Sequence, residues 1–114
     1  MAATTAGLSP GVILSSDGYI LTSAHVIRNV DDIQVRLDDG RRFRARVVGL
    51  DARSDVGVLK IAATGLPSAT MGDSSQLATG DWVAAIGAPF GFHGTFTAGV
   101  VSATGRLLNG GGDI

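Results

Sequence analysis

The stretch that decides the fold is YILTSAHV, residues 19–26. Its first four residues are aromatic, apolar or β-branched, which is typical of a strand, and His25 follows after two small residues, Ser23 and Ala24. A second stretch, RSDVGVLK at residues 53–60, places Asp55 at the start of another apolar run. A histidine and an aspartate, each at one end of a predicted strand, are two parts of a proton-transfer relay. Neither stretch identifies the nucleophile that would complete the relay.

The composition predicts one small globular domain. The chain has 114 residues, of which 45% are hydrophobic and only 17% are charged, compared with about 25% charged in an average soluble domain. The net charge of -1 gives no general sign of a nucleic-acid or anionic-membrane partner. The absence of cysteine excludes disulfides, thiol chemistry and thiolate metal sites.

The sequence carries no recognisable targeting segment. No apolar run approaches the roughly 20 residues that span a bilayer, and residues 1–5 lack the basic start and apolar run of a signal peptide. We therefore expect either a cytosolic protein or an export signal outside this sequence.

Short strands and tight turns dominate the predicted secondary structure. There are 17 glycines, no glutamate and one lysine, so two good helix formers are almost missing. Val26 to Val30 is expected to form one helical turn, and residues 1–10 a flexible, poorly held arm. The turn signals separate strands expected at 11–15, 19–22, 33–37, 43–50, 56–61, 82–87 and 95–104. This all-β pattern predicts a small antiparallel barrel or sandwich.

Several short motifs occur in a characteristic order. They are GYILT at 18–22 and AHV at 24–26, VGLD at 48–51, DVGVLKI at 55–61, GDS at 72–74, GDWV at 80–83, IGAPFG at 86–91 and TAGVVS at 97–102. In this order and spacing the chain resembles the front half of an HtrA/Deg-family protease domain, a trypsin-like serine protease. The resemblance extends from about residue 11 to residue 106, although Ser23-Ala24 and Ala88 stand where the family often has asparagine.

The resemblance implies a fold and a site. The fold would be the first six-stranded antiparallel barrel of the trypsin-like double barrel over residues 11–91, with residues 92–114 starting the second barrel and ending in a glycine-rich tail. In the family, the histidine that matches His25 is the general base and the aspartate that matches Asp55 is its orienting partner. The family's nucleophile lies in a Gly-Asn-Ser-Gly-Gly segment that this sequence does not contain, so these 114 residues alone are expected to be inactive.

The resemblance also implies partners and a location. Relatives hydrolyse unfolded or damaged polypeptides in the bacterial cell envelope or periplasm as trimer-based homo-oligomers, and no cofactor or metal is implied. An unpaired strand at 95–104 would in addition favour a strand-exchanged dimer.

The remaining serines and His93 have simpler interpretations. Ser74, in a Gly-Asp-Ser that lacks the following glycine, is expected to act in a turn or cap. Ser23 and Ser54 flank the predicted pair and are expected to support it through hydrogen bonds. His93 has too few partners for a zinc site and is expected to be structural or exposed.

Two other functions remain open. Five arginines lie within residues 36–46; a solvated hairpin face is the simpler interpretation, but an anion-binding module using this hairpin from Arg36 to Arg46 is an alternative. A non-catalytic β-barrel interaction module is the other.

Overall fold

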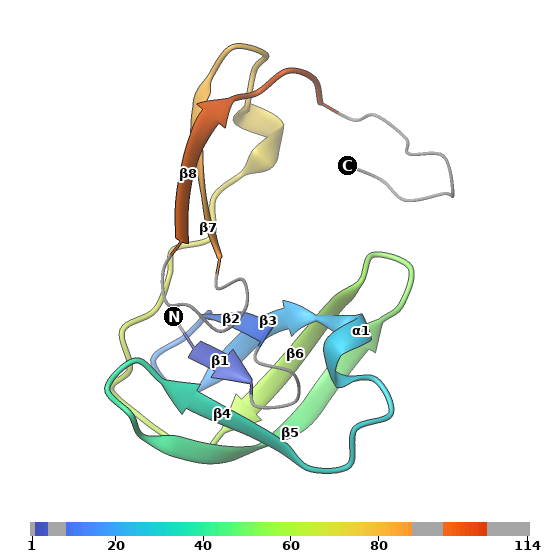
Figure 1. Cartoon of the computed structure of the whole chain (residues 1–114), viewed down its shortest axis with the longest axis vertical. Coiled ribbons are helices and arrows are strands. Elements are labelled where there is room, and N and C mark those ends of the chain that lie inside the picture. The colour runs from blue at the N-terminus through green and yellow to red at the C-terminus, as the bar shows by residue number, and fades with distance from the viewer. Residues whose placement is uncertain (1, 5–8, 88–94, 105–114) are drawn as a thin grey trace. The chain divides into compact units, whose positions relative to one another are not determined.

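The computed structural model describes residues 2–4, 9–87 and 95–104 (Figure 1). The chain divides into two compact units, Met1–Thr70 and Met71–Ile114. The first unit contains strands β1 to β6 and a short helix, and the second contains strands β7 and β8. The described part is mostly β, as the sequence predicts.

The first unit is an antiparallel barrel. Strands β2, β3, β6, β5 and β4 form a curled sheet in that order, and β1 pairs with both of its edge strands, which closes the barrel. One short helix, α1, follows β3 directly. The bounds are β1 Ala2–Thr4, β2 Ser9–Ile13, β3 Tyr19–Ser23, α1 Ala24–Ile27, β4 Ile33–Leu37, β5 Arg42–Asp51 and β6 Val56–Ile61.

The structure corrects which strand is the sixth of the barrel. The prediction used residues 82–87 and left residues 1–10 as a poorly held arm, but Ala2–Thr4 of that arm is β1, which pairs with β2 at Gly11 and with β4 at Leu37. Residues 82–87 form a strand outside the barrel. The prediction failed because strand pairing uses backbone N–H and C=O groups, so a three-residue strand of small side chains can close the sheet without an apolar pattern.

A hairpin whose turn contains Asp17-Gly18 joins β2 to β3, as expected from the strands predicted at 11–15 and 19–22. β2 and β3 pair in antiparallel register, and the Leu14 N–H donates to the Tyr19 carbonyl at 2.8 Å. Gly18 has a φ of 102°, and a Cβ at this position would lie 2.4 Å from the carbonyl oxygen of Ile61. Both the backbone conformation and the close approach therefore require glycine.

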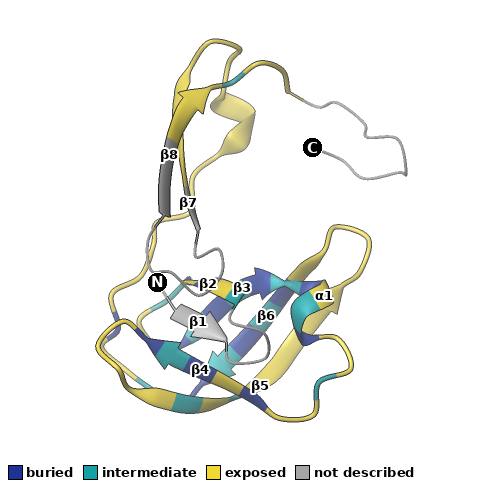
Figure 2. Cartoon of the chain, in the orientation of Figure 1, coloured by how far each residue is buried: buried dark blue, intermediate teal, exposed yellow. Residues whose placement is uncertain are grey.

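The core lies inside the barrel. Its side chains come from β2, β3, α1, β4, β6 and the segment after β6, and Figure 2 shows these buried positions in dark blue. On β5, Phe43 and Ala45 are half-buried while the arginines at 42, 44 and 46 are exposed, so apolar and polar residues alternate as expected; Val47, expected on the same face as Phe43 and Ala45, is 40% exposed. The buried core residues are Ile13, Ile20, Ile27, Ile33, Val35, Leu37, Leu59, Ile61 and Leu66.

Helix α1 is held against β6. The helix begins at Ala24, two residues earlier than predicted, and ends at Ile27. Ile27 is buried, and a Cβ on Gly57 of β6 would lie only 2.7 Å from its Cδ1 atom. The missing side chain at Gly57 therefore makes room for the helix that carries His25.

The second unit contains a two-stranded sheet. Strands β7, Trp82–Gly87, and β8, Thr95–Val100, pair antiparallel along their full length. The expected strand at 95–104 is thus shorter, and one of its edges is paired. A 3₁₀ turn, η1, spans Ser74–Gln76, as expected for a turn role of Ser74. Predictions for His93 and for the glycine-rich tail lie outside the described residues.

No helix in the described part of the chain is both long and apolar enough to cross a membrane.

Candidate active site

The topology brings His25 and Asp55 together. Strands β3 and β6 are antiparallel neighbours, and their last paired residues at this end are Ser23 and Val56. His25 comes two residues after Ser23, in the first turn of α1, and Asp55 comes directly before Val56. Residues thirty positions apart in the sequence therefore meet at one end of the barrel.

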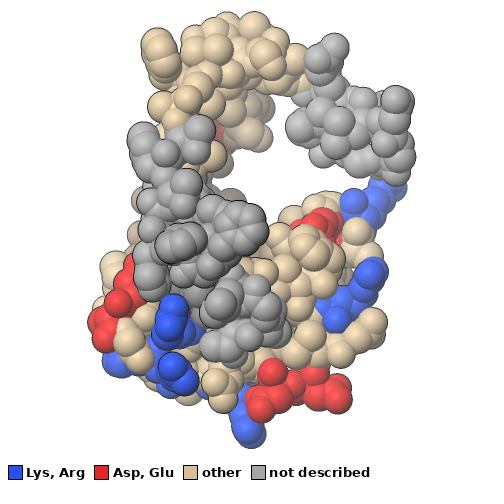
Figure 3. Space-filling view, viewed as in Figure 1, with Lys and Arg blue, Asp and Glu red and all other residues tan. Residues whose placement is uncertain are grey.

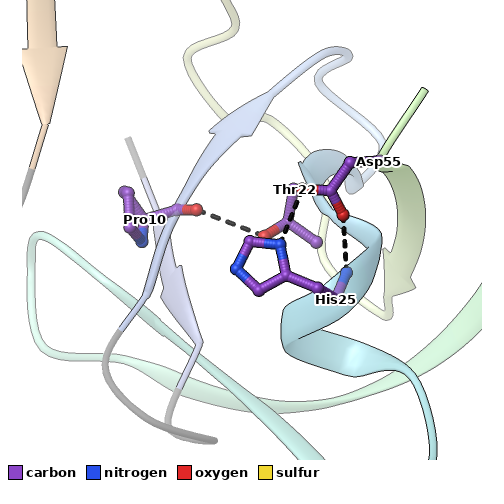
Figure 4. A network of polar contacts seen from close by, with 4 residues as sticks. All are labelled: Pro10, Thr22, His25 and Asp55. Carbon is purple, nitrogen blue, oxygen red and sulfur yellow. Dashed lines mark hydrogen bonds and ion pairs between the residues drawn. The ribbon is translucent and has the colours of Figure 1, made fainter. Parts of the chain in front are cut away.

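The Asp55 carboxylate contacts His25 through both oxygens (Figure 4). Its Oδ2 lies 2.6 Å from Nδ1 of the imidazole, and its Oδ1 accepts the backbone N–H of His25 at 2.8 Å. The backbone carbonyl of Asp55 also accepts the N–H of Ala24 at 3.1 Å. These contacts fix the start of α1 and the orientation of the imidazole relative to the carboxylate.

The contacts set the protonation states. The backbone N–H of His25 is the largest cause that lowers the pKa of Asp55, followed by the His25 ring and then by the charge of Arg28. The carboxylate is therefore ionised at neutral pH, and Nδ1 of His25 is the donor in the 2.6 Å contact. The other ring nitrogen, Nε2, lies on the side of the ring away from Asp55 (Figure 4). The His25 side chain is 65% exposed, so Nε2 is accessible to another group.

Asp55 has an uncommon backbone conformation. Its φ of 57° lies in the left-handed region, which few non-glycine residues adopt, although aspartate and asparagine tolerate it better than most. Such conformations persist where the surrounding structure holds them, and they cluster at functional sites. No pattern in the sequence indicates this conformation.

Thr22 is a buried polar residue that the sequence analysis did not single out. It is 7% exposed, and its hydroxyl donates to the carbonyl of Pro10 in β2 at 3.2 Å (Figure 4). The hydrogen bond links β2 to β3 three residues before His25. The sequence pattern that could have pointed to Thr22 is a threonine at the end of the mainly apolar run 19–22.

The serines beside the pair do not have the partners that were expected. Ser23 is the N-cap of α1, but its side chain makes no capping hydrogen bond. The hydroxyl of Ser54 acts on Asp51 instead, where it is the largest cause that lowers the pKa of the carboxyl. Ser54 is therefore engaged with the turn before Asp55.

Acidic groups accompany the basic hairpin. Arg44 pairs with Asp32 at 3.2 Å and Arg41 with Asp39 at 2.8 Å, and the Lys60 ammonium donates to backbone carbonyls. Figure 3 shows acidic and basic side chains next to each other on the face that it presents. This favours a solvated surface over an anion site. Among the described residues, no three histidine or acidic side chains are grouped to hold a metal.

A comparison with protein families gives one matching domain. Residues 10–113 match the trypsin-like peptidase domain. Because the match covers most of the sequence, the chain belongs to the trypsin-like peptidase domain family. Its relatives within that family are of the HtrA/DegP-like type.

Two curated relatives illustrate the similarity. Both are named probable periplasmic serine endoprotease DegP-like; one, from Marinomonas sp., is 56% identical over 89% of this chain, and one, from Halomonas elongata, is 52% identical over 89%. The chain spans only 22% and 21% of their lengths.

Solved structures are also similar. The HtrA-type protease AlgW with a tripeptide matches with a TM-score of 0.86 and 46% identity, over 96% of this chain and 37% of that chain. AlgW with a decapeptide matches with a TM-score of 0.83 and 46% identity, over 90% of this chain and 33% of that chain. The chain thus spans about a third of these proteases.

Proposed function

We propose that this chain supplies the general base and its orienting carboxylate to an HtrA-type serine endopeptidase. The observation that carries the proposal is the contact of both Asp55 oxygens with His25, at 2.6 and 2.8 Å. In this role Nε2 of His25 takes the proton of a serine hydroxyl as it attacks a peptide carbonyl. The imidazolium then gives the proton to the leaving amine, and the ionised Asp55 stabilises the positive charge.

The nucleophile would come from residues outside this chain. In the family the serine and the oxyanion-hole N–H groups belong to a Gly-Asn-Ser-Gly-Gly segment that the sequence does not contain. In the complete protease, hairpin β7–β8 would start the second barrel, which carries that segment. We therefore expect the 114 residues alone to have no peptidase activity.

The substrates and location follow from the relatives. The expected substrates are unfolded or damaged polypeptides, and AlgW has been solved with a tripeptide and a decapeptide. The expected location is the periplasm, for which the DegP-like relatives are named. The expected assembly is a homo-oligomer, trimer-based as in the family, or a strand-exchanged dimer when the chain is alone. No cofactor is required in this mechanism.

The test is peptidase activity on an unfolded protein, measured for the complete protease that contains this sequence. Asp55→Asn should lower kcat by about 10⁴-fold, because the amide stabilises the wrong tautomer of His25, and His25→Ala should abolish turnover. Asp39→Asn is the matched control, since Asp39 is also an exposed carboxylate in a hydrogen-bonded contact, here with Arg41.

The outcome separates the candidate functions. Unchanged activity in both His25→Ala and Asp55→Asn would overturn the catalytic proposal and favour the non-catalytic interaction module. A serine-directed fluorophosphonate should label the complete protease and leave the 114-residue chain unlabelled. Labelling of the short chain would contradict its predicted inactivity.

A further inference from the structure

The turn between β5 and β6 determines where Asp55 lies. The last residue pair of this hairpin joins Asp51 to Val56, so the turn consists of residues 52–55. Asp55 is its final residue and has the left-handed φ of 57°. The direction of the Asp55 side chain therefore depends on the conformation of the whole turn.

A second carboxylate, that of Asp51, holds this turn from its start. The Oδ1 atom of Asp51 accepts the backbone N–H of Arg53 at 3.1 Å. The hydroxyl of Ser54, the backbone N–H of Arg53 and the backbone N–H of Ser54 lower the pKa of the Asp51 carboxyl. A carboxylate can accept several such bonds at once. One side chain thus constrains two of the four residues in the turn.

We propose that Asp51 is a positioning residue for the His25–Asp55 pair. Its carboxylate holds the turn 52–55 in the conformation that places both oxygens of Asp55 on His25. Asp51 makes none of the described contacts with His25 itself. The inference rests on the proposed function, because it assigns Asp51 a role in the reaction only if His25 and Asp55 are catalytic.

The geometry explains why such support is needed. The Asp55 carboxylate contacts two groups of His25 at once, the backbone N–H at 2.8 Å and the ring Nδ1 at 2.6 Å. These two contacts allow little movement of the Asp55 backbone. Its left-handed conformation is disfavoured when the turn is free. A turn without the Asp51 contacts can relax to ordinary backbone angles, and the carboxylate then loses one or both of its contacts with His25.

The experiment compares variants of the 114-residue chain by NMR, which does not depend on catalysis. The two readouts are the low-field proton on Nδ1 of His25 and the pH midpoint at which Asp55 titrates. Asp51→Ala should weaken or remove the low-field proton and raise the midpoint of Asp55 toward its ordinary value. Asp51→Asn should retain both signals, because its amide oxygen still accepts the N–H groups of Arg53 and Ser54.

A matched control lies at the other end of β5. Asp39 accepts the backbone N–H of Arg41 at 3.0 Å, the same aspartate–x–arginine contact that Asp51 makes with Arg53. Asp39→Ala should leave both readouts of the pair unchanged. Equal effects of Asp39→Ala and Asp51→Ala would mean that loss of any turn carboxylate disturbs the barrel, and the proposal would be wrong.

Further outcomes also decide the proposal. Unchanged signals in Asp51→Ala would overturn it, as would an Asp51→Asn variant that behaves like Asp51→Ala. If circular dichroism shows that Asp51→Ala does not fold, Ser54→Ala removes only the hydroxyl contact and should still raise the Asp55 midpoint; no shift would overturn the proposal.

In the complete protease, Asp51→Ala should lower kcat by about 10- to 100-fold, the scale expected for a small misplacement of a catalytic group, with KM little changed. Asp51→Asn should restore most of the activity. Activity that survives His25→Ala would disprove the proposed function, whereas the NMR result on Asp51 would still decide whether the turn holds Asp55.

Discussion

The barrel and the β7–β8 hairpin are built from similar strands but differ in what they bury. In the barrel each strand pairs on both sides, and Ile20, Val35 and Leu59 are completely buried. In the second unit two strands pair only with each other, and Trp82 is 82% exposed. A sheet that closes on itself encloses a core, whereas an isolated two-stranded sheet has little apolar surface to bury.

This difference concerns the candidate site directly. His25 and Asp55 come from segments next to β3 and β6, which are held on both sides within the barrel. A pair of side chains that must keep distances of 2.6 and 2.8 Å needs such rigid support. The β7–β8 hairpin by itself does not offer such rigid support. Three pairs of matched substitutions, with one member in each unit, test this comparison, and so does a single substitution whose effect is measured in both units.

The largest expected effect is the loss of a core side chain. Leu59→Ala in β6 should lower the free energy of unfolding by about 2–5 kcal/mol, because it leaves a cavity in a closed core. Leu77→Ala in the second unit should change it by less than about 0.5 kcal/mol, since Leu77 is 42% exposed. Urea unfolding followed by circular dichroism measures both. Equal effects would mean that the two units share one core.

The second pair tests glycines with the same backbone conformation. Gly18 and Gly80 have φ values of 102° and 96°, but only at Gly18 would a Cβ meet another backbone atom, at 2.4 Å. Gly80→Ala should lower the free energy of unfolding only by the strain of the left-handed conformation, about 1–2 kcal/mol. Gly18→Ala should cost at least about 1 kcal/mol more, because the β2–β3 turn must move away from β6. Thermal unfolding measures the difference; similar values for the two variants would show that Gly18 is not tightly packed.

The third pair tests how closely helix α1 packs against β6. Gly57→Ala in β6 brings a methyl group against Ile27 and should destabilise the barrel by about 1 kcal/mol, because Ile27 must adopt a new position. Gly99→Ala in β8 meets nothing within 4 Å and should be close to neutral. The same unfolding experiment applies, and NMR shifts of His25 report movement of the helix. A neutral Gly57→Ala variant would contradict the tight packing of α1.

The smallest expected effect is on how the stability of the protein changes at acidic pH. The pKa of Asp55 is lowered by His25, thirty positions away, whereas the pKa of Asp73 is lowered by its neighbour Ser75. A lowered folded-state pKa contributes stability that is present at neutral pH and is lost as the pH falls through that pKa.

His25→Ala should therefore raise the titration midpoint of Asp55 part of the way toward its ordinary value, because the ring contact is lost while the backbone N–H at position 25 is kept. The midpoint of Asp73 should stay unchanged. Carbon NMR of the carboxyl groups between pH 2 and 6 measures both midpoints. This pH window includes the ordinary aspartate pKa of about 3.9. A shift of Asp73 in this variant would mean that the carboxyls respond to a change in the whole fold.

Most of the local structure could be predicted from the sequence. The strands, the Asp17-Gly18 turn and the alternation of β5 follow from side-chain periodicity and glycine conformation, which act over a few residues. His25 and Asp55 could be selected because each follows or precedes a recognisable strand. Their predicted catalytic roles came from the family resemblance.

The tertiary structure decided what depends on distant partners. Only strand pairing determined that Ala2–Thr4 closes the barrel and that Trp82–Gly87 lies outside it, because backbone hydrogen bonds carry no sequence pattern. The left-handed conformation of Asp55 and the contacts of Asp51 with Arg53 and Ser54 were equally invisible in the sequence. A turn of four residues has several conformations. The one observed carries the contacts of Asp55 with helix α1 and the contact of Asp51 with Arg53.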